Sequence, residues 1–264
     1  MTRVALITGG SRGIGFSFAQ ALLGAGYKVL ITAARDAARL EAAHAALAAD
    51  FKGAIASCVA DVSVADHAKA AVDHALDRFG RLDILVNNAG RGPREVSETF
   101  HVTPPRFWDI APQDWAQIVA TNVNGPYLMA RAAAPLMMAQ GWGRIIGVST
   151  SRVTMVRPGF APYGPSKAAL DTLTAIMAKE LMESGVTANI LLPGGATETD
   201  FIPQDGRSGH YQNLLPPDVM NEALLWLCSA QADAVTGARI VGKLWNPEDP
   251  AAAREDCGDP PRIL

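Results

Sequence analysis

The sequence predicts an α/β protein in which about seven parallel strands form one sheet with helices on both faces. Short β-branched or aliphatic runs alternate with longer Ala-rich stretches along the chain. The length of 264 residues suits one domain that buries a large core. Residues able to do chemistry follow several of the apolar runs directly, which is where a parallel sheet places its ligands.

The expected elements alternate from the start of the chain. Apolar runs predict strands at 4–8, 28–32, 54–59, 82–86, 144–148, 186–192 and 239–241. Helical patterns predict helices at 14–25, 37–49, 64–79, 118–139, 166–183 and 218–228. The fourth helix has an irregular start near Gly125-Pro126. Because strands and helices alternate, we expect a parallel sheet with right-handed crossovers.

Three segments interrupt this alternation. Residues 91–114 and 195–217 are long connections, and we expect both to cover a substrate. Residues 247–264 are polar and rich in proline, so we expect a surface arm or an oligomer contact there. The predicted organisation is one domain at 1–246 followed by a tail at 247–264.

Composition narrows the class of protein and its partners. Hydrophobic residues make up 49% and charged residues 19%, as is typical of a soluble globular chain. The net charge of −3 gives no basic surplus, so neither nucleic acid nor an anionic membrane is an expected partner. No signal-peptide or membrane-span pattern is visible, and the expected location is the cytoplasm. Three separated cysteines and five histidines show no ligand spacing, so we expect neither a disulfide framework nor a metal.

A glycine-rich turn joins the first expected strand to the first expected helix. The turn reads Thr-Gly-Gly-Ser-Arg-Gly-Ile-Gly over 8–15. Glycines allow the backbone to approach a pyrophosphate, and the free N–H groups of the helix N-terminus bind that anion. The position between strand and helix predicts a Rossmann-type dinucleotide site. Its expected contacts are Gly9, Ser11, Arg12, Gly13, Ile14 and Gly15.

The end of the second expected strand favours NADP(H) over NAD(H). An acidic residue there usually holds the ribose hydroxyls, but alanine occupies the corresponding position in Ala33-Ala34-Arg35-Asp36. Asp36 comes one residue late and is expected to cap the next helix. Arg12 and Arg35 offer positive charge to a 2′-phosphate, although Arg12 in a loop is also compatible with simple solvation. NAD(H) stays the alternative cofactor.

Tyr163 and Lys167 lie four residues apart at the start of a long expected helix, so they share one face. A lysine ammonium held near the phenol favours the phenolate and lowers its pKa from an ordinary value of about 10. Such a tyrosine donates a proton to a developing alkoxide or accepts one in the reverse direction. Pro165 between them is tolerated in a first helical turn.

Hydroxyl and amide groups accompany this pair. Ser149, Thr150 and Ser151 follow the fifth expected strand, and one hydroxyl there is expected to bond the substrate oxygen. Asn122 is a polar residue in an apolar helix and needs a partner or a water. A water anchored by Asn122 would relay protons to Lys167.

These motifs together resemble the compact, single-domain form of the short-chain dehydrogenase/reductase family, from about Thr2 to Val241. The family's Thr-Gly-x-x-x-Gly-x-Gly turn matches residues 8–15. Its Asn-Asn-Ala-Gly motif matches residues 87–90, and its Asn-x-x-x-Pro-Gly stretch matches residues 189–194. The tyrosine, lysine and asparagine fall at the family's catalytic positions.

The resemblance implies an oxidoreductase that moves a hydride between the cofactor and a carbonyl or secondary alcohol, with Tyr163 as acid/base. The catalytic residues it implies are Asn122, Thr150, Tyr163 and Lys167. Further cofactor contacts it implies are Asp61, Val62, Asn88, Ala89, Gly90, Tyr163, Lys167, Pro193, Gly194 and Thr197, with Thr199 as the alternative to Thr197. It also implies a homodimer or homotetramer, with 166–183 as a contact face.

Two departures from the family pattern affect these expectations. Thr150 stands where the family usually has a serine, thirteen residues before Tyr163, and Ser149 or Ser151 is the alternative hydroxyl. Residues 242–245 read Gly-Lys-Leu-Trp where an Asp-Gly-Gly often stands, which alters the pocket floor or a subunit contact.

Other functions and roles stay open at this point. A non-catalytic NADP(H)-binding sensor or scaffold would share the fold, although it has no need for the whole catalytic set. A transiently redox-active epimerase or dehydratase is a weaker option. His101 and His210 lie in the two long loops, and we expect solvated loop residues there, with contact to substrate as the alternative. Phe107 and Trp108 either line an apolar substrate site or cover core edges, and the expected substrate is a medium-sized, partly apolar carbonyl or alcohol.

Overall fold

A computed structural model describes residues 2–203, 211 and 213–256, and in it eight strands form one sheet. The strand order is β3-β2-β1-β4-β5-β6-β7-β8. The first seven strands pair in parallel, and β8 pairs antiparallel with β7. The order reverses direction between β1 and β4, and this is the point at which a doubly wound sheet binds its ligand. The α/β doubly wound fold class is confirmed.

The strands agree closely with the expected apolar runs. They are β1 Val4–Ile7, β2 Lys28–Ala33, β3 Ile55–Val59, β4 Ile84–Asn87, β5 Gly143–Val148, β6 Val186–Leu192, β7 Ala238–Val241 and β8 Arg254–Asp256. Strands β1, β4, β5, β6 and β7 are buried along their whole length, as expected for a sheet covered on both faces.

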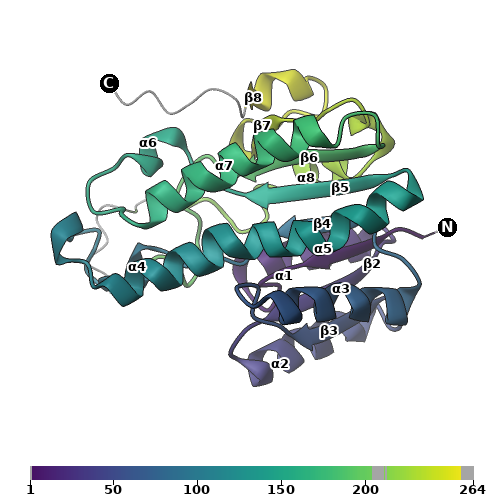
Figure 1. The fold of residues 1–264 in the computed structure, drawn as a ribbon, viewed down its shortest axis with the longest axis horizontal. Helices are drawn as coiled ribbons and strands as arrows, with labels where there is room; N and C mark the ends of the chain where they lie inside the picture. Colours follow the sequence, from purple (N-terminus) through teal and green to yellow (C-terminus); the bar gives the residue numbers. More distant parts are fainter. Residues whose placement is uncertain (1, 204–210, 212, 257–264) are drawn as a thin grey trace.

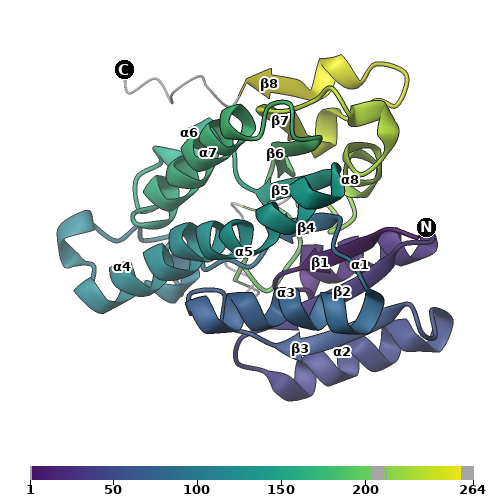
Figure 2. The ribbon, with the colours of Figure 1, turned by 45° about the vertical axis from the view of Figure 1, so that its right-hand side comes forward.

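Helices cover both faces of the sheet (Figures 1 and 2). They are α1 Gly13–Gly24, α2 Ala37–Asp50, α3 Ala65–Phe79, α4 Pro112–Val119, α5 Gly125–Gln140, α6 Arg152–Met155, α7 Tyr163–Glu180 and α8 Asn221–Leu227. Shorter turns are η1 Pro93–Glu95, η2 Phe107–Asp109, η3 Ala120–Asn124, η4 Ala230–Ala232, η5 Gly242–Leu244 and η6 Pro250–Ala253. One core contains side chains of α1, α2 and α8, and a second contains side chains of α3, α5 and α7. The sheet therefore separates two apolar layers.

The expected helix at 118–139 is instead two α-helices, α4 and α5, joined by the π-helical turn η3. The Gly125 N–H bonds the Ala120 carbonyl, five residues back. Pro126 follows directly and has no N–H to continue an α-helical ladder, which explains the local change of pitch. The π-helical turn contains Asn122.

The eighth strand was not predicted. Residues 254–256 read Arg-Glu-Asp, a run without an apolar residue, so hydrophobic patterning gives no signal for a strand there. In the structure, Glu255 pairs directly with Arg239 of β7. The sheet thus includes part of the segment that was expected to be a tail, and residues 257–264 lie outside the described part.

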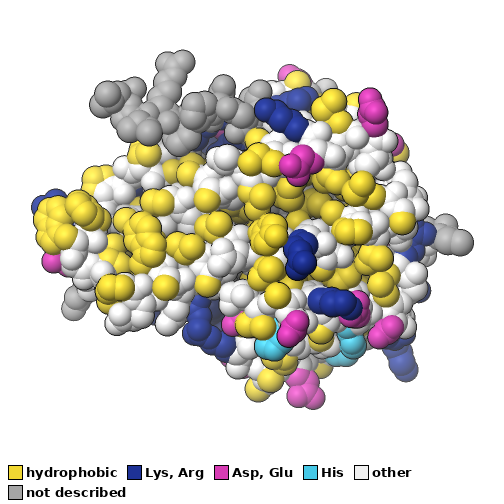
Figure 3. Space-filling model, in the orientation of Figure 1, with side chains coloured by type: hydrophobic (Ala, Val, Ile, Leu, Met, Phe, Trp, Pro, Cys, Tyr) yellow, Lys and Arg dark blue, Asp and Glu magenta, His cyan; other side chains and the backbone are white. Residues whose placement is uncertain are grey.

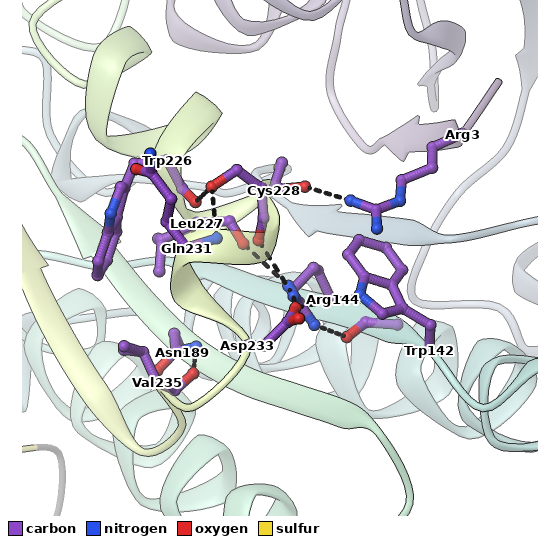
Figure 4. Close-up of polar contacts among 12 residues, drawn as sticks. Arg3, Trp142, Arg144, Asn189, Trp226, Leu227, Cys228, Gln231, Asp233 and Val235 are labelled. Carbon is purple, nitrogen blue, oxygen red and sulfur yellow. Dashed lines mark hydrogen bonds and ion pairs between the residues drawn. The ribbon is translucent and has the colours of Figure 1, made fainter.

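A buried arginine joins the amino-terminal end of β5 to the segment after α8 (Figure 4). Arg144 is 1% exposed, its Nε donates to the Leu227 carbonyl at 3.0 Å, and its guanidinium pairs with Asp233. The guanidinium groups of Arg3 and Arg144 lie 3.5 and 4.0 Å from the ring centre of Trp142. These contacts lie at the opposite end of the strands from the ligand-binding edge, so we assign them to stability.

Candidate active site

A cavity of about 880 Å³ opens at the carboxyl ends of the parallel strands. Its walls come from the segments that follow β1, β2, β3, β4, β5 and β6. The predicted site residues that line it are Gly9, Ser11, Arg12, Gly13, Ile14, Gly15, Arg35, Asp61, Val62, Asn88, Ala89, Gly90, Thr150, Tyr163, Lys167, Pro193, Gly194 and Thr197. Thr199, the alternative to Thr197, lines it as well. Residues from distant parts of the sequence thus meet at one edge of the sheet.

The glycine turn before α1 depends on Asn88 for its shape. Gly9 has a φ of +65°, a conformation that side chains disfavour. The Asn88 Nδ2 donates to the carbonyls of Thr8 at 2.9 Å and Gly9 at 3.0 Å. A Cβ on Gly15 would lie 2.3 Å from the Gly9 carbonyl oxygen, so only glycine fits there. The turn therefore has the close backbone packing that a pyrophosphate site needs.

Thr8 connects the same turn to the loop after β4. Its Oγ1 accepts hydrogen bonds from the backbone N–H groups of Asn88 and Ala89, each at 3.0 Å. Asn88 thus uses both its backbone and its side chain to hold the turn. The two predicted motifs, 8–15 and 87–90, are one structural unit.

Arginines gather at the end of the cavity beyond β2. The Arg12 Nη1 lies 2.6 Å and the Arg39 Nη2 3.0 Å from the same oxygen of Asp200. The hydrogen bond from Arg12, with the charges of both arginines, lowers the pKa of Asp200 despite partial burial. Arg35 is exposed at the cavity edge, and Asp36 caps α2 as expected by accepting from the Arg39 N–H at 2.8 Å. Arg39 was missed because it lies one helical turn inside α2.

Asp61 and Val62 form the wall after β3. Burial raises the pKa of Asp61, but hydrogen bonds from Ser63 and the charges of Arg35 and Arg91 outweigh it, and the pKa is lowered. Asp61 is therefore an anionic acceptor at neutral pH. Val62 packs against α5 closely enough that a Cβ on Gly125 would lie 2.7 Å from its Cγ2.

Tyr163 is the first residue of α7, and the Thr150 side chain lies close enough to its hydroxyl to lower its pKa. Ser151 instead caps α6, with its Oγ accepting from the Thr154 N–H at 3.2 Å. The Ser149 Oγ is buried and has no hydrogen-bond partner among the described residues. Of the three hydroxyls after β5, the one on Thr150 is the one that acts on the tyrosine hydroxyl.

Lys167 lies one turn after Tyr163, with its Nζ 5.8 Å from the tyrosine ring centre and donating to the Val148 carbonyl at 2.8 Å. Burial lowers the pKa of Lys167 to about 8. Burial likewise raises the pKa of Tyr163 to about 12, although the Thr150 hydrogen bond lowers it. The pKa of Tyr163 is therefore shifted in the opposite direction from the one expected from lysine alone, because desolvation of the phenolate is the larger effect.

Asn122 is completely buried, and it does not line the cavity. Its Nδ2 donates to the Arg91 carbonyl and to the Ser166 Oγ, each at 2.9 Å, and its Oδ1 accepts from the Arg91 N–H at 2.8 Å. Ser166 in turn donates to the Tyr163 carbonyl at 2.7 Å. The Asn122 side chain thus links the loop after β4 to the first turn of α7, and its predicted role in a water relay stays a prediction.

Aromatic rings surround Tyr163 on the side of the long loops. Phe201 and Phe160 have ring centres 5.4 and 6.3 Å from that of Tyr163, and Phe100 lies 5.6 Å from Phe160. All three phenylalanines line the cavity. Phe160 and Phe201 were missed, because nothing in a loop sequence tells which aromatic residue turns inward.

The remaining loop residues have other environments. Phe107 and Trp108 are 70% and 68% exposed and pack against each other, so neither expectation for them is met. His101 contacts the rings of Phe100 and Tyr211 and is not a solvated residue. His210 lies outside the described residues.

In the part of the chain that the structure describes, no three His, Cys, Asp or Glu side chains gather in a way that would hold a metal ion. No helix there is long and apolar enough to cross a membrane.

Comparisons with known proteins point to one family. The family described as short chain dehydrogenase matches residues 3–207. A 3-oxoacyl-[acyl-carrier-protein] reductase of a Synechocystis strain is 36% identical over 192 residues, which are 73% of each chain. The crystal structure of a 3-ketoacyl-(acyl-carrier-protein) reductase from Brucella melitensis complexed with NADH is 33% identical, with a TM-score of 0.76 over 90% of this chain and 95% of that one. A dehydrogenase/reductase from Sinorhizobium meliloti is 30% identical, with a TM-score of 0.79 over 91% and 94%.

Proposed function

This chain belongs to the short-chain dehydrogenase/reductase family and is an NAD(P)-dependent enzyme, and from this premise we propose its reaction. The enzyme transfers a hydride between NADP(H) and a carbonyl or secondary alcohol, with Tyr163 as acid/base. One observation carries the proposal. Tyr163 and Thr150 line the same cavity as a glycine turn built for a dinucleotide.

The residues present fit a dinucleotide. The turn at 8–15 and the loop at 88–90 would hold the pyrophosphate and its riboses, and Pro193, Gly194 and Thr197 would hold the nicotinamide end. When bound, the cofactor supplies or accepts the hydride. Lys167 is proposed to bind the nicotinamide ribose, since its Nζ is buried within the cavity wall.

NADP(H) is preferred over NAD(H) because of charge. No carboxylate stands at the position after β2 that would hold ribose hydroxyls, and Arg12, Arg35 and Arg39 lie at that end of the cavity. Arginine forks suit a 2′-phosphate. The Asp200 carboxylate forms ion pairs with Arg12 and Arg39. A 2′-phosphate would therefore compete with this carboxylate for the two arginines.

Proton transfer in the direction of reduction needs a protonated tyrosine. The raised pKa of Tyr163 keeps its hydroxyl protonated at neutral pH. Tyr163 then donates its proton to the carbonyl oxygen as that oxygen becomes an alkoxide, and the Thr150 hydroxyl donates a hydrogen bond to the same oxygen. In the direction of oxidation, the Lys167 ammonium stabilises the phenolate that must accept the proton.

The substrate part of the cavity favours a carbonyl compound with an apolar body. Phe100, Phe160 and Phe201 form its wall next to Tyr163. Because two of the similar proteins are named as reductases of 3-oxoacyl groups, a 3-oxoacyl thioester is the first compound to test.

The Tyr163→Phe variant tests the mechanism. We expect NADPH binding to persist and turnover to fall roughly 10²- to 10⁴-fold, because the acid is lost while the ring still packs. The probes are acetoacetyl-coenzyme A, acetophenone and cyclohexanone, followed by the loss of NADPH absorbance. Tyr27→Phe, whose hydroxyl donates to the Cys228 carbonyl outside the cavity, is the matched control.

Two outcomes would contradict the proposal. Wild-type turnover in Tyr163→Phe would remove the tyrosine from the mechanism. Tight NADPH binding without turnover of any carbonyl would favour the alternative, a non-catalytic sensor or scaffold.

The surface over α4, α5 and α7 supports self-association. Hydrophobic side chains gather on this face (Figure 3). Exposed apolar side chains of these helices include Trp115 of α4, Tyr127 and Met138 of α5, and Ile176 of α7. We propose a homodimer or homotetramer that uses this face. Light scattering after size-exclusion chromatography measures the assembly, and a monomer at micromolar concentration would contradict it.

A further inference from the structure

Arg239, in the middle of β7, is a charged residue in the protein interior. It is completely buried, and it does not line the cavity. A buried guanidinium is costly unless its charge and its donors are satisfied. The contacts of Arg239 therefore show what the fold requires of it.

The guanidinium of Arg239 contacts three separate elements. It pairs with Asp171 of α7 through Nη1. Its Nε lies 3.2 Å from a carboxylate oxygen of Glu255, the residue opposite it on β8. Its Nη2 donates to the Thr150 carbonyl at 2.9 Å. One side chain thus joins β8, the helix of the catalytic pair and the threonine that lies beside Tyr163 in the cavity.

Asp171, the residue of α7 that pairs with Arg239, lies on the same face of the helix as the catalytic pair. Asp171 lies four residues after Lys167 and eight after Tyr163, so all three side chains share one face of the helix. Arg239 therefore binds the face of α7 that presents the acid/base.

Among the described residues, the Thr150 carbonyl accepts its hydrogen bond from Arg239. Its neighbours are held independently, since the Ser149 N–H bonds the Leu191 carbonyl and Ser151 caps α6. Arg239 holds the residue between them. The planar guanidinium of arginine holds separate nitrogens against Asp171, Glu255 and Thr150 in a fixed geometry, which the compact ammonium of lysine does not reproduce.

We propose that Arg239 is a positioning residue that sets the Thr150 hydroxyl against the Tyr163 hydroxyl. It does so by fixing the Thr150 backbone to Asp171 on α7 and to Glu255 on β8. Arg239 touches neither the cavity nor the reacting atoms, so it acts through Thr150. The inference rests on the proposed role of Thr150.

The Arg239→Lys variant tests this directly. The charge is kept, but the fork is lost, so we expect kcat with acetoacetyl-coenzyme A to fall about 10- to 100-fold. The Kd of NADPH should stay unchanged, because the dinucleotide turn is held by Asn88 and Thr8. Arg254→Lys, at an exposed arginine on β8, is the matched control and should keep wild-type kcat. An unchanged kcat in Arg239→Lys overturns the proposal.

A double-mutant cycle separates positioning from general stability. If Arg239 acts through Thr150, its substitution should cost almost nothing more once Thr150→Ala has removed the hydroxyl. The same fold loss of kcat in both backgrounds overturns the proposal. Wild-type turnover in Thr150→Ala would instead refute the proposed role of Thr150 itself, so the two failures are distinguishable.

A further variant keeps the test valid if the Arg239→Lys protein fails to fold. Arg239→Met combined with Asp171→Leu replaces the buried pair with apolar side chains of similar size, which folded proteins often tolerate. We expect this variant to fold and to bind NADPH with wild-type affinity, but with the reduced kcat. Wild-type kcat in this variant overturns the proposal.

Discussion

Lys167 is predicted to lower the free energy of unfolding of the protein, because its charge is buried in the native state. Its Nζ is buried, and burial lowers its pKa from an ordinary 10.5 to about 8. That difference corresponds to about 3 kcal/mol of unfavourable free energy when the lysine is charged in the native state. The perturbation that exposes this cost is Lys167→Met, which keeps an unbranched apolar chain and removes the charge.

The sign of the pH dependence follows from the two pKa values. Below pH 8 Lys167 is protonated in both states, and the native state bears the full cost of burying the charge. Between pH 8 and pH 10.5 the native state releases the proton while the unfolded state keeps it, so the stability of the wild type rises relative to Lys167→Met. Integration of this linkage gives a gain of about 2.5 kcal/mol between pH 7 and pH 10.

Urea unfolding of both cofactor-free proteins at several pH values measures this difference. Tyr163 does not contribute, because its pKa is raised to about 12 and it stays neutral in both proteins below pH 10. Loss of the hydrogen bond to the Val148 carbonyl lowers the unfolding free energy of Lys167→Met by about 1 kcal/mol. This loss is the same at every pH, so it does not change how the difference between the two proteins depends on pH. A difference in unfolding free energy that stays flat from pH 7 to pH 10 would refute the reasoning.

Substitutions at three other positions test separate parts of the site. Only the hydroxyl of Thr150 is needed, so Thr150→Ser should keep most of the wild-type kcat, whereas the kcat of Thr150→Val should fall about 10²-fold or more. Equal kcat values in the two variants would assign the active-site hydroxyl to Ser149 instead. Asn88→Ala leaves the carbonyls of the glycine turn without their donor and should cost about 1 to 3 kcal/mol in urea unfolding, together with weaker NADPH binding. Asp200→Asn removes the carboxylate that competes for Arg12, so titration should show NADPH binding up to about fivefold more tightly while NADH affinity is unchanged; a parallel change for both cofactors would contradict the assignment of Arg12 to the 2′-phosphate.

Much of the sheet could be predicted because its strands are apolar runs, and such runs have a single stable place in a protein of this size. The glycine turn and the Tyr163–Lys167 pair could be predicted as well, since their chemistry depends on local spacing. The strand β8 could not be, because its pairing depends on Arg239, a residue fifteen positions before it. The inward rings of Phe160 and Phe201 depend on loop geometry that no local pattern encodes. The direction of the Tyr163 pKa depends on burial, which is a property of the whole fold.

The short strand β8 also determines whether the edge of the sheet can pair with another chain. Without it, the backbone N–H and C=O groups of β7 along one side would be unpaired, and the four residues of β7 are buried and largely apolar. Such an edge is a template for pairing with another chain. The Arg-Glu-Asp strand β8 pairs with the backbone of β7 and becomes the new edge of the sheet. This edge is charged and too short to recruit a further strand. Shortening the chain before residue 254 would therefore favour aggregation through β7, in addition to removing the Glu255 partner of Arg239.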